Sequence, residues 1–193
     1  MYKNLCTVLL LIFISIQTQA QTGKFNLERR LYPGSVTKAD GQVIRGFIFN
    51  QGKEDNQRQC LFYTDADDMR TKTVFKPADL VGYSIENFQY KSLNYSGNIG
   101  FGKSGRNFLR VLKPGAVAEY IYYLGEEQIV LQKGDEEPIG NASLFLSFRK
   151  SMLKLVGDDT ELAGKIERKE KGYGLTAIDA IVDEYNTWAA AKK

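Results

Sequence analysis

The chain has 193 residues, with 26 basic and 23 acidic side chains, a net charge of +3 and no histidine. Basic and acidic residues are interspersed and form no basic stripe, so nucleic acid is not an expected partner. Without histidine, Ser-His-Asp and Cys-His catalysis and histidine-bearing zinc sites are excluded, and we expect neither a metal nor a cofactor.

Residues 1–20 have the pattern of a cleavable secretory signal peptide. Lys3 precedes an apolar run over residues 5–16, and the small Thr18 and Ala20 occupy the positions that signal peptidase restricts. An apolar run of about a dozen residues is too short to cross a bilayer, which needs about twenty. Cys6 lies too early, and without a lipobox, to carry a lipid. We therefore predict cleavage after Ala20 and an exported mature chain with no transmembrane segment.

Residues 21–30 are expected to form a flexible N-terminus ahead of a single α+β domain at residues 31–193. Removal of residues 1–20 leaves 25 basic and 23 acidic side chains, a nearly neutral mature chain. A chain of this length can bury about 70% of its unfolded surface without disulfides. Its single cysteine, Cys60, lies in an apolar run and is expected to be a buried, unreactive thiol.

Residues 31–133 are predicted to form the β-rich part of the domain, because apolar residues recur there with a period near two. We expect an antiparallel meander sheet or partly open barrel of about seven to nine strands. Asp40-Gly41 is a predicted hairpin turn, because glycine accepts a positive φ. The predicted strands are 32–37, 42–50, 59–64, 71–75, two within 81–95, 107–113, 116–124 and 128–133.

Residues 141–193 are predicted to form about three helices that pack on the sheet, because the apolar spacing lengthens to three and four. Residues 158–161 resemble a capping box and open the second helix. The third carries the only tryptophan, Trp188, on an apolar stripe, and contact with the sheet is favoured over an exposed surface for a partner helix. The stripe of the first helix is Phe145, Phe148, Met152, Leu155 and Val156, and that of the third is Ile178, Ile181, Val182, Tyr185, Trp188 and Ala189.

Residues 97–104 match the phosphate-binding pattern G-x-x-x-x-G-K-S. The candidate ligands of a phosphate are Gly97, Gly102, Lys103 and Ser104. A nucleotide loop opens directly into a helix, whereas here Gly105 is followed by a strand-like alternation over residues 106–112. A glycine-rich hairpin loop is therefore favoured, with anion or nucleotide binding as an alternative.

Two further hypotheses rest on side chains of the strand region. A carboxylate pair can hydrolyse glycans without histidine, and the candidates are Glu86, Glu119, Glu126 and Asp135. Tyrosines in the strands either line a sugar or peptide groove or are ordinary strand formers. These tyrosines are Tyr83, Tyr90, Tyr95, Tyr120, Tyr122 and Tyr123.

The segments GQVIRGFIF, FKPADLVGYSIENFQY, RVLKPGAVAEYIYY, FRKSMLKLVGDDTELAGKI and IVDEYNTW resemble a family of uncharacterised exported proteins of Bacteroidota-type bacteria. The resemblance covers most of the mature chain and rests on dispersed structural positions. These are Gly46, Pro77, Gly82, Gly115, Asp159, Tyr185 and Asn186. It implies a Gram-negative envelope, and hence the periplasm or cell surface, and it implies no reaction.

These observations together predict a binding or interaction protein of the bacterial cell envelope without catalytic residues. Its expected partner is another envelope protein or a surface polymer. A glycan hydrolase with a carboxylate pair is the alternative, followed by an anion- or nucleotide-binding protein that uses residues 97–104.

Overall fold

The computed structural model describes residues 25–97 and 105–192. The predicted signal peptide, residues 1–20, lies outside this range, as do residues 21–24 of the expected flexible N-terminus. Within residues 25–30, which form no helix or strand, Phe25 is buried and its ring contacts Phe88 edge-on at 4.9 Å.

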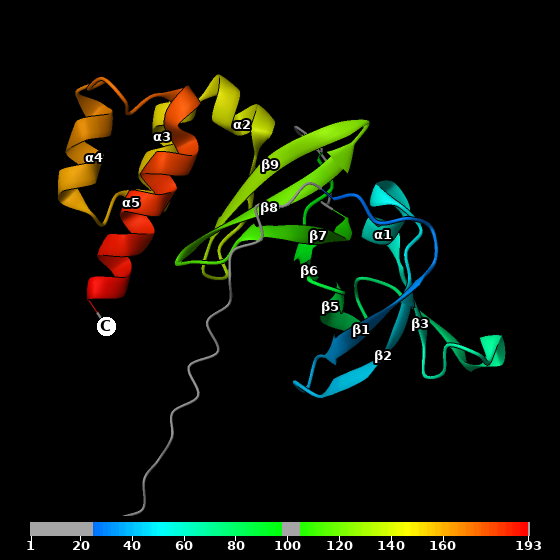
Figure 1. Cartoon of the computed structure of the whole chain (residues 1–193). Helices are drawn as coiled ribbons and strands as arrows, with labels where there is room; N and C mark the ends of the chain where they lie inside the picture. The colour runs from blue at the N-terminus through cyan, green and yellow to red at the C-terminus, as the bar shows by residue number, and fades with distance from the viewer. Residues whose placement is uncertain (1–24, 98–104, 193) are drawn as a thin grey trace, which may run out of the picture.

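The described residues form one open, ten-stranded antiparallel sheet with five α-helices, which is an α+β fold (Figure 1). All nine predicted strands are present. The sheet has one strand more than the expected seven to nine, and this additional strand is the short β10. Two residues are too few to show any periodicity. The strands are β1 Leu31–Lys38, β2 Val43–Phe49, β3 Cys60–Tyr63, β4 Lys72–Phe75, β5 Leu80–Ile85, β6 Phe88–Asn94, β7 Arg106–Lys113, β8 Val117–Leu124, β9 Glu126–Lys133 and β10 Ile139–Gly140.

The predicted meander holds with one exception. The strand order is β10-β9-β8-β7-β6-β5-β1-β2-β3-β4, so two meanders join where β5 pairs with β1 rather than with β4. The predicted turn between β1 and β2 is confirmed, since Gly41 has a φ of 84°. The junction of β1 with β5 brings Ser35 opposite Ser84 in the middle of the sheet.

Four helices follow the strands where about three were expected. They are α2 Asn141–Leu146, α3 Phe148–Val156, α4 Thr160–Glu167 and α5 Ile178–Ala191, and short 3-10 turns occur at Met69–Thr71 and Leu175–Ala177. The predicted start of α4 is confirmed, but its cap is Asp159, one residue after the first position of the predicted capping box, because the Asp159 carboxylate accepts the Leu162 N–H at 3.1 Å. The first predicted helix is divided at Ser147 into α2 and α3.

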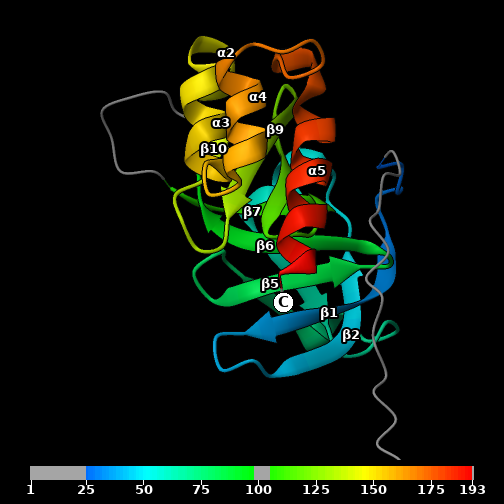
Figure 2. The ribbon, with the colours of Figure 1, turned by 90° about the vertical axis from the view of Figure 1, so that its left-hand side faces the viewer.

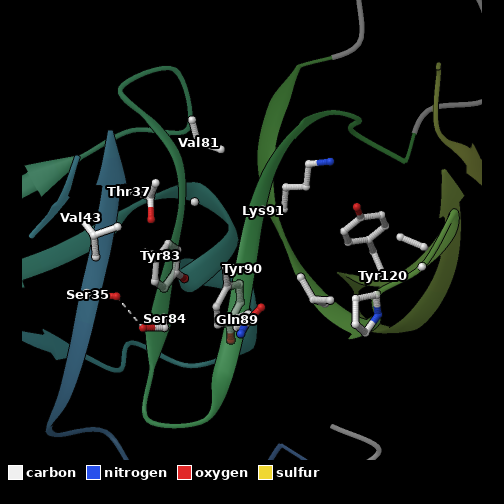
Figure 3. Close-up of a pocket in the computed structure, with 15 residues that line it drawn as sticks. Ser35, Thr37, Val43, Val81, Tyr83, Ser84, Gln89, Tyr90, Lys91 and Tyr120 are labelled. Carbon is white, nitrogen blue, oxygen red and sulfur yellow. Dashed lines mark hydrogen bonds between the residues drawn. The ribbon is translucent and has the colours of Figure 1, made fainter. Parts of the chain in front are cut away.

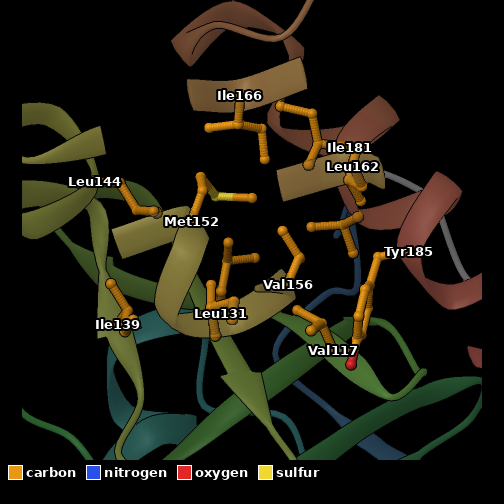
Figure 4. Close-up of a cluster of buried hydrophobic side chains, with 12 residues drawn as sticks. Val117, Leu131, Ile139, Leu144, Met152, Val156, Leu162, Ile166, Ile181 and Tyr185 are labelled. Carbon is orange, nitrogen blue, oxygen red and sulfur yellow. The ribbon is translucent and has the colours of Figure 1, made fainter. Parts of the chain in front are cut away.

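The helical layer covers only one end of the sheet, where α2 to α5 pack on β8, β9 and β10 (Figures 1 and 2). The predicted stripe of α5 contacts this core, with Ile181, Val182 and Tyr185 buried. The predicted stripe of the first helix is wrong at Phe145, which is exposed, while Leu144 is fully buried in its place. The buried cluster, which Figure 4 shows, comprises Val117, Leu131, Ile139, Leu144, Met152, Leu155, Val156, Leu162, Ile166, Ile181, Val182 and Tyr185.

One side chain of α5 completes the hydrogen bonding of the sheet. Pairing between β7 and β8 shifts register near Lys113 and extends no further than Glu119. The Val117 N–H donates to Asn186 Oδ1, and Asn186 Nδ2 donates to the Val117 carbonyl, each at 2.9 Å. A Cβ on Gly115 would collide with this amide, so glycine there permits the docking of α5.

The helix α1, Lys53–Arg58, was not predicted. Its six polar residues offer no apolar period, and it is stabilised by tertiary hydrogen bonds of two buried amides. Gln57 Nε2 donates to the Tyr123 carbonyl at 2.8 Å, and the Tyr123 N–H donates back to Gln57 Oε1. Asn56 Nδ2 donates to Asn50 Oδ1 at 2.7 Å. Thus α1 connects β8 with the residue that follows β2.

A second core is formed by the N-terminal segment and by side chains of β1, β2, β3, β5, β6 and β7. It contains Cys60, which is 1% exposed, so the predicted buried thiol is confirmed. Burial raises the pKa of this thiol well above its ordinary value.

Candidate functional site

A groove of about 530 Å³ opens on the face of the sheet formed by β1, β5, β6, β7 and β8 (Figure 3). The close-up shows β1, β5 and β6 along one side and Tyr120 on the other. The groove is lined by Ser35, Thr37, Val43, Val81, Gly82, Tyr83, Ser84, Gln89, Tyr90, Lys91, Val111, Pro114, Gly115, Ala118 and Tyr120. It is the candidate binding site of the described chain.

The sheet surface beneath the groove is depressed because small residues occupy the neighbouring strands β1 and β5. Ser35 on β1 and Ser84 on β5 lie opposite each other, and their hydroxyls form a hydrogen bond of 2.9 Å. Thr37 lies opposite Gly82, where a Cβ would collide with the Tyr90 carbonyl. Since side chains at alternate positions of a strand share one face, these short residues leave that face uncovered by bulk.

Apolar and charged side chains complete the lining. Val43 and Val81 are 56% and 46% exposed, so the groove presents apolar surface to solvent. Lys91 Nζ lies 5.9 Å from the centroid of the Tyr120 ring and 3.5 Å from Gln132 Oε1. Lys91 is the only charged residue in the lining, as far as the described chain extends. Burial raises the pKa of Tyr120 to about 12, so its phenol is neutral at physiological pH.

The strand tyrosines Tyr83, Tyr90 and Tyr122 are buried and offer no exposed ring to a sugar. Tyr83 and Tyr90 stack with centroids 4.5 Å apart inside the core, and the Tyr83 hydroxyl donates to the Asn56 carbonyl at 2.6 Å. Tyr122 is also buried, and its hydroxyl donates to the Ser96 carbonyl at 3.1 Å. Their aromatic faces are therefore used in packing.

Of the phosphate-binding candidates, Gly97 is described, whereas Gly102, Lys103 and Ser104 lie outside the described residues. Gly97 has a φ of 74° and packs against the Tyr122 ring. The predicted strand after the motif is confirmed, because β7 begins at Arg106. A nucleotide loop needs a helix at this place, so the nucleotide interpretation lacks its anion-facing helix N-terminus.

The four carboxylate candidates lie in different environments. Glu86 lies in the turn between β5 and β6, Glu126 begins β9 next to the turn at Gly125, and Asp135 follows the end of β9. All three are exposed, whereas the Glu119 side chain on β8 is fully buried beneath α5. The fold therefore places the one buried carboxylate away from the groove, and none of the four candidates lines it.

Glu119 is the most perturbed carboxylate of the described chain. Neither carboxyl oxygen accepts a hydrogen bond, and Lys113 Nζ lies 3.7 Å from Oε1. The same ammonium lies 3.1 Å from both carboxyl oxygens of Asp183, so its charge is shared. Burial, opposed in part by Lys113 and reinforced by Asp179 and Asp183, raises the pKa of Glu119 to about 7. The group joins the sheet to α5 and has no access to a substrate.

The described residues contain no group of three or more Asp, Glu, Cys or His side chains arranged to hold a metal ion. Among the same residues, no helix combines the length and apolar character needed to span a membrane.

Of the strand tyrosines considered for a groove, Tyr83, Tyr90 and Tyr120 border this one, and the sequence pointed to none of its other lining residues. The sequence did contain one indication of the groove. Small residues occur at alternate positions in two strands, at Ser35 and Thr37 and at Gly82 and Ser84, and they leave one face of each strand without large side chains. That β1 and β5 are neighbours was not visible in the sequence, because the expected meander pairs β5 with β4.

Comparison with known proteins gave no match to a protein-family model, to a curated protein or to a solved structure. The fold and the groove therefore define a class only: an α+β domain with an open ligand-sized groove on its sheet.

Proposed function

We propose that this chain is an exported binding protein of the bacterial cell envelope, and that its groove holds a segment of another envelope protein or of a surface polymer. The export part of the proposal rests on the signal-peptide pattern of residues 1–20. The binding part rests on the groove.

The observation that carries the proposal is the chemistry of the lining. Hydroxyls of Ser35, Thr37 and Ser84 can both donate and accept hydrogen bonds, as the polar groups of a peptide or a glycan require. Exposed Val43 and Val81 add apolar contact area. A concave, mostly apolar site with a few polar groups is the usual form of a ligand site.

The titratable side chains in the lining of the groove favour a binding protein over an enzyme. Glycoside hydrolysis by the usual mechanism needs two carboxyl groups that flank the scissile bond. The described lining offers the Lys91 ammonium and buried tyrosines, and it contains no carboxylate. No observation in the described structure favours the glycan hydrolase.

Site-specific photo-crosslinking in the native envelope tests the proposal. A photoreactive residue at Thr37, in the groove, is expected to capture one defined protein or polymer. The matched control is Thr73, an exposed threonine on the edge strand β4, which is expected to capture nothing specific. Adducts of equal identity and yield at both positions, or none at Thr37, would contradict the proposal.

A pair of variants separates the groove from general surface effects. Val43→Arg places a long charged side chain in the groove, whereas Val74→Arg makes the same change at a 43% exposed position on β4. We expect Val43→Arg to abolish the Thr37 adduct and Val74→Arg to leave it unchanged. Equal effects of the two variants would place the contact elsewhere.

A further inference from the structure

The most exposed large apolar side chains of the described chain are adjacent. Phe145 and Leu146 at the end of α2 are each 71% exposed, directly after the fully buried Leu144. The helix ends at Ser147 and α3 starts anew, so the pair, here called the apolar tip, projects beyond the core that Leu144 anchors. Single exposed apolar residues are common, but a contiguous exposed group marks an interaction surface.

Hollows lie on both sides of the apolar tip. One of about 630 Å³ is bordered by Phe145, Leu146 and Tyr173, and another of about 520 Å³ is bordered by Leu146 and Pro138. Neither shares a lining residue with the groove on the sheet. Figure 2 shows α2 at the end of the molecule opposite β1 and β2, so both surfaces can be occupied at once.

Basic side chains surround the apolar tip. Arg149, Lys150, Lys154 and Lys169, here called the basic rim, line the two hollows, and none of them forms an ion pair with another described residue. The acidic residues of the same lining are Glu137 and Glu170, of which Glu170 is paired with Arg168 at 2.7 Å.

Two lysines of the basic rim are spaced so that their charges repel each other on one side of α3. Lys150 and Lys154 are four residues apart on α3, so they project from the same side of the helix. Like charges at this spacing destabilise a helix by a few tenths of a kcal/mol. No carboxylate of the described chain forms an ion pair with either lysine. An anion from outside the chain would reduce this repulsion.

We infer that the apolar tip and basic rim form a docking site for an anionic membrane surface. An apolar pair inserts into the boundary between headgroups and acyl chains, while lysines and arginines around it attract anionic headgroups. A protein partner is the weaker explanation, because a stable protein interface buries about 800 Å² on each side and two adjacent side chains supply only a small part of it. The inference does not depend on what the groove binds: it places the chain on a bilayer by the end of the molecule opposite β1 and β2 (Figure 2).

The test is vesicle flotation of the exported chain purified from its native envelope. Vesicles of phosphatidylcholine with 30% phosphatidylglycerol are compared with pure phosphatidylcholine. We expect partitioning into the anionic vesicles only, weakened by salt. Absence of binding to anionic vesicles, or equal binding to both compositions, overturns the inference.

Matched variants separate insertion from adsorption. The double variant Phe145→Ser, Leu146→Ser is expected to lower partitioning about 100-fold, because both apolar contacts are lost. Lys150→Glu is expected to lower it about tenfold or more, since a repelled charge replaces an attracted one. The controls are Leu124→Ser, at a position 56% exposed at the end of β8, and Lys72→Glu on β4, and both should partition like the parent chain.

Tryptophan fluorescence measures insertion directly and does not depend on whether the variants above fold. Phe145→Trp in the Trp188→Phe background should show a blue-shifted emission with anionic vesicles and quenching by brominated lipid. An unshifted emission in the presence of bound vesicles would show electrostatic adsorption alone and refute insertion. Binding only to an acidic protein of the envelope, with no vesicle binding, would assign the surface to a protein partner.

Discussion

The buried carboxyl group of Glu119 is expected to make the free energy of unfolding depend on pH. Its side chain is fully buried between β8 and α5, and its pKa is raised to about 7 from an ordinary value of 4.5. Between these pH values the folded protein holds a proton that the unfolded chain has released. Stability therefore falls as pH rises from about 4.5 to about 7, and this part of the loss is complete above pH 7.

The size of the effect follows from the difference between the two pKa values. About 2.5 pH units, each worth about 1.36 kcal/mol, correspond to a loss of about 3 kcal/mol at pH 8 relative to pH 4. Glu119→Gln has the same shape and no titration. The variant should match the parent within about 1 kcal/mol at pH 4 and exceed it in free energy of unfolding by about 3 kcal/mol at pH 8.

The assay is urea denaturation of both proteins at several pH values from 4 to 8. The difference between variant and parent removes the contribution of the titrating groups that do not interact with Glu119, since these are shared. Glu126→Gln, which alters an exposed carboxylate of the same hairpin, is the matched control. A difference for Glu119→Gln that does not change with pH refutes the reasoning. So does a parent that is more stable than the variant at pH 8, since Lys113 would then stabilise the carboxylate more than burial destabilises it.

Two further predictions concern the structural core. Asn186→Ala leaves the N–H and carbonyl of Val117 without their side-chain partner, and we expect a loss of about 2–3 kcal/mol in urea denaturation. Thr187→Ala, which removes an exposed hydroxyl from the same helix, should change stability by less than about 0.5 kcal/mol, and equal losses in the two variants would contradict the role of the amide. Cys60, buried and with a raised pKa, should react with a thiol reagent only after unfolding, as followed by absorbance of the released chromophore. Rapid labelling of the native protein would show that this core opens.

The candidate site was only partly accessible from the sequence. The absence of histidine and the strand in place of a helix at Arg106 were visible in the residues, and both bear on which chemistries are possible. The groove was not visible, because it depends on the pairing of β1 with β5, which places Ser35 beside Ser84. Two serines 49 residues apart carry no local signal of their contact.

The sequence by itself determined the order and type of the long elements. Alternation with a period of two marks β1 to β9, and spacings of three and four mark α3 to α5, because these periods reflect local backbone geometry. Only the tertiary structure decided the rest. The helix α1 depends on the hydrogen bonds of Gln57 with Tyr123, β10 depends on pairing with β9, and the exposure of Phe145 depends on the break at Ser147. The contact of Gln57 with Tyr123 joins residues 66 positions apart, and β10 and the break at Ser147 are too short to produce a periodicity in the sequence.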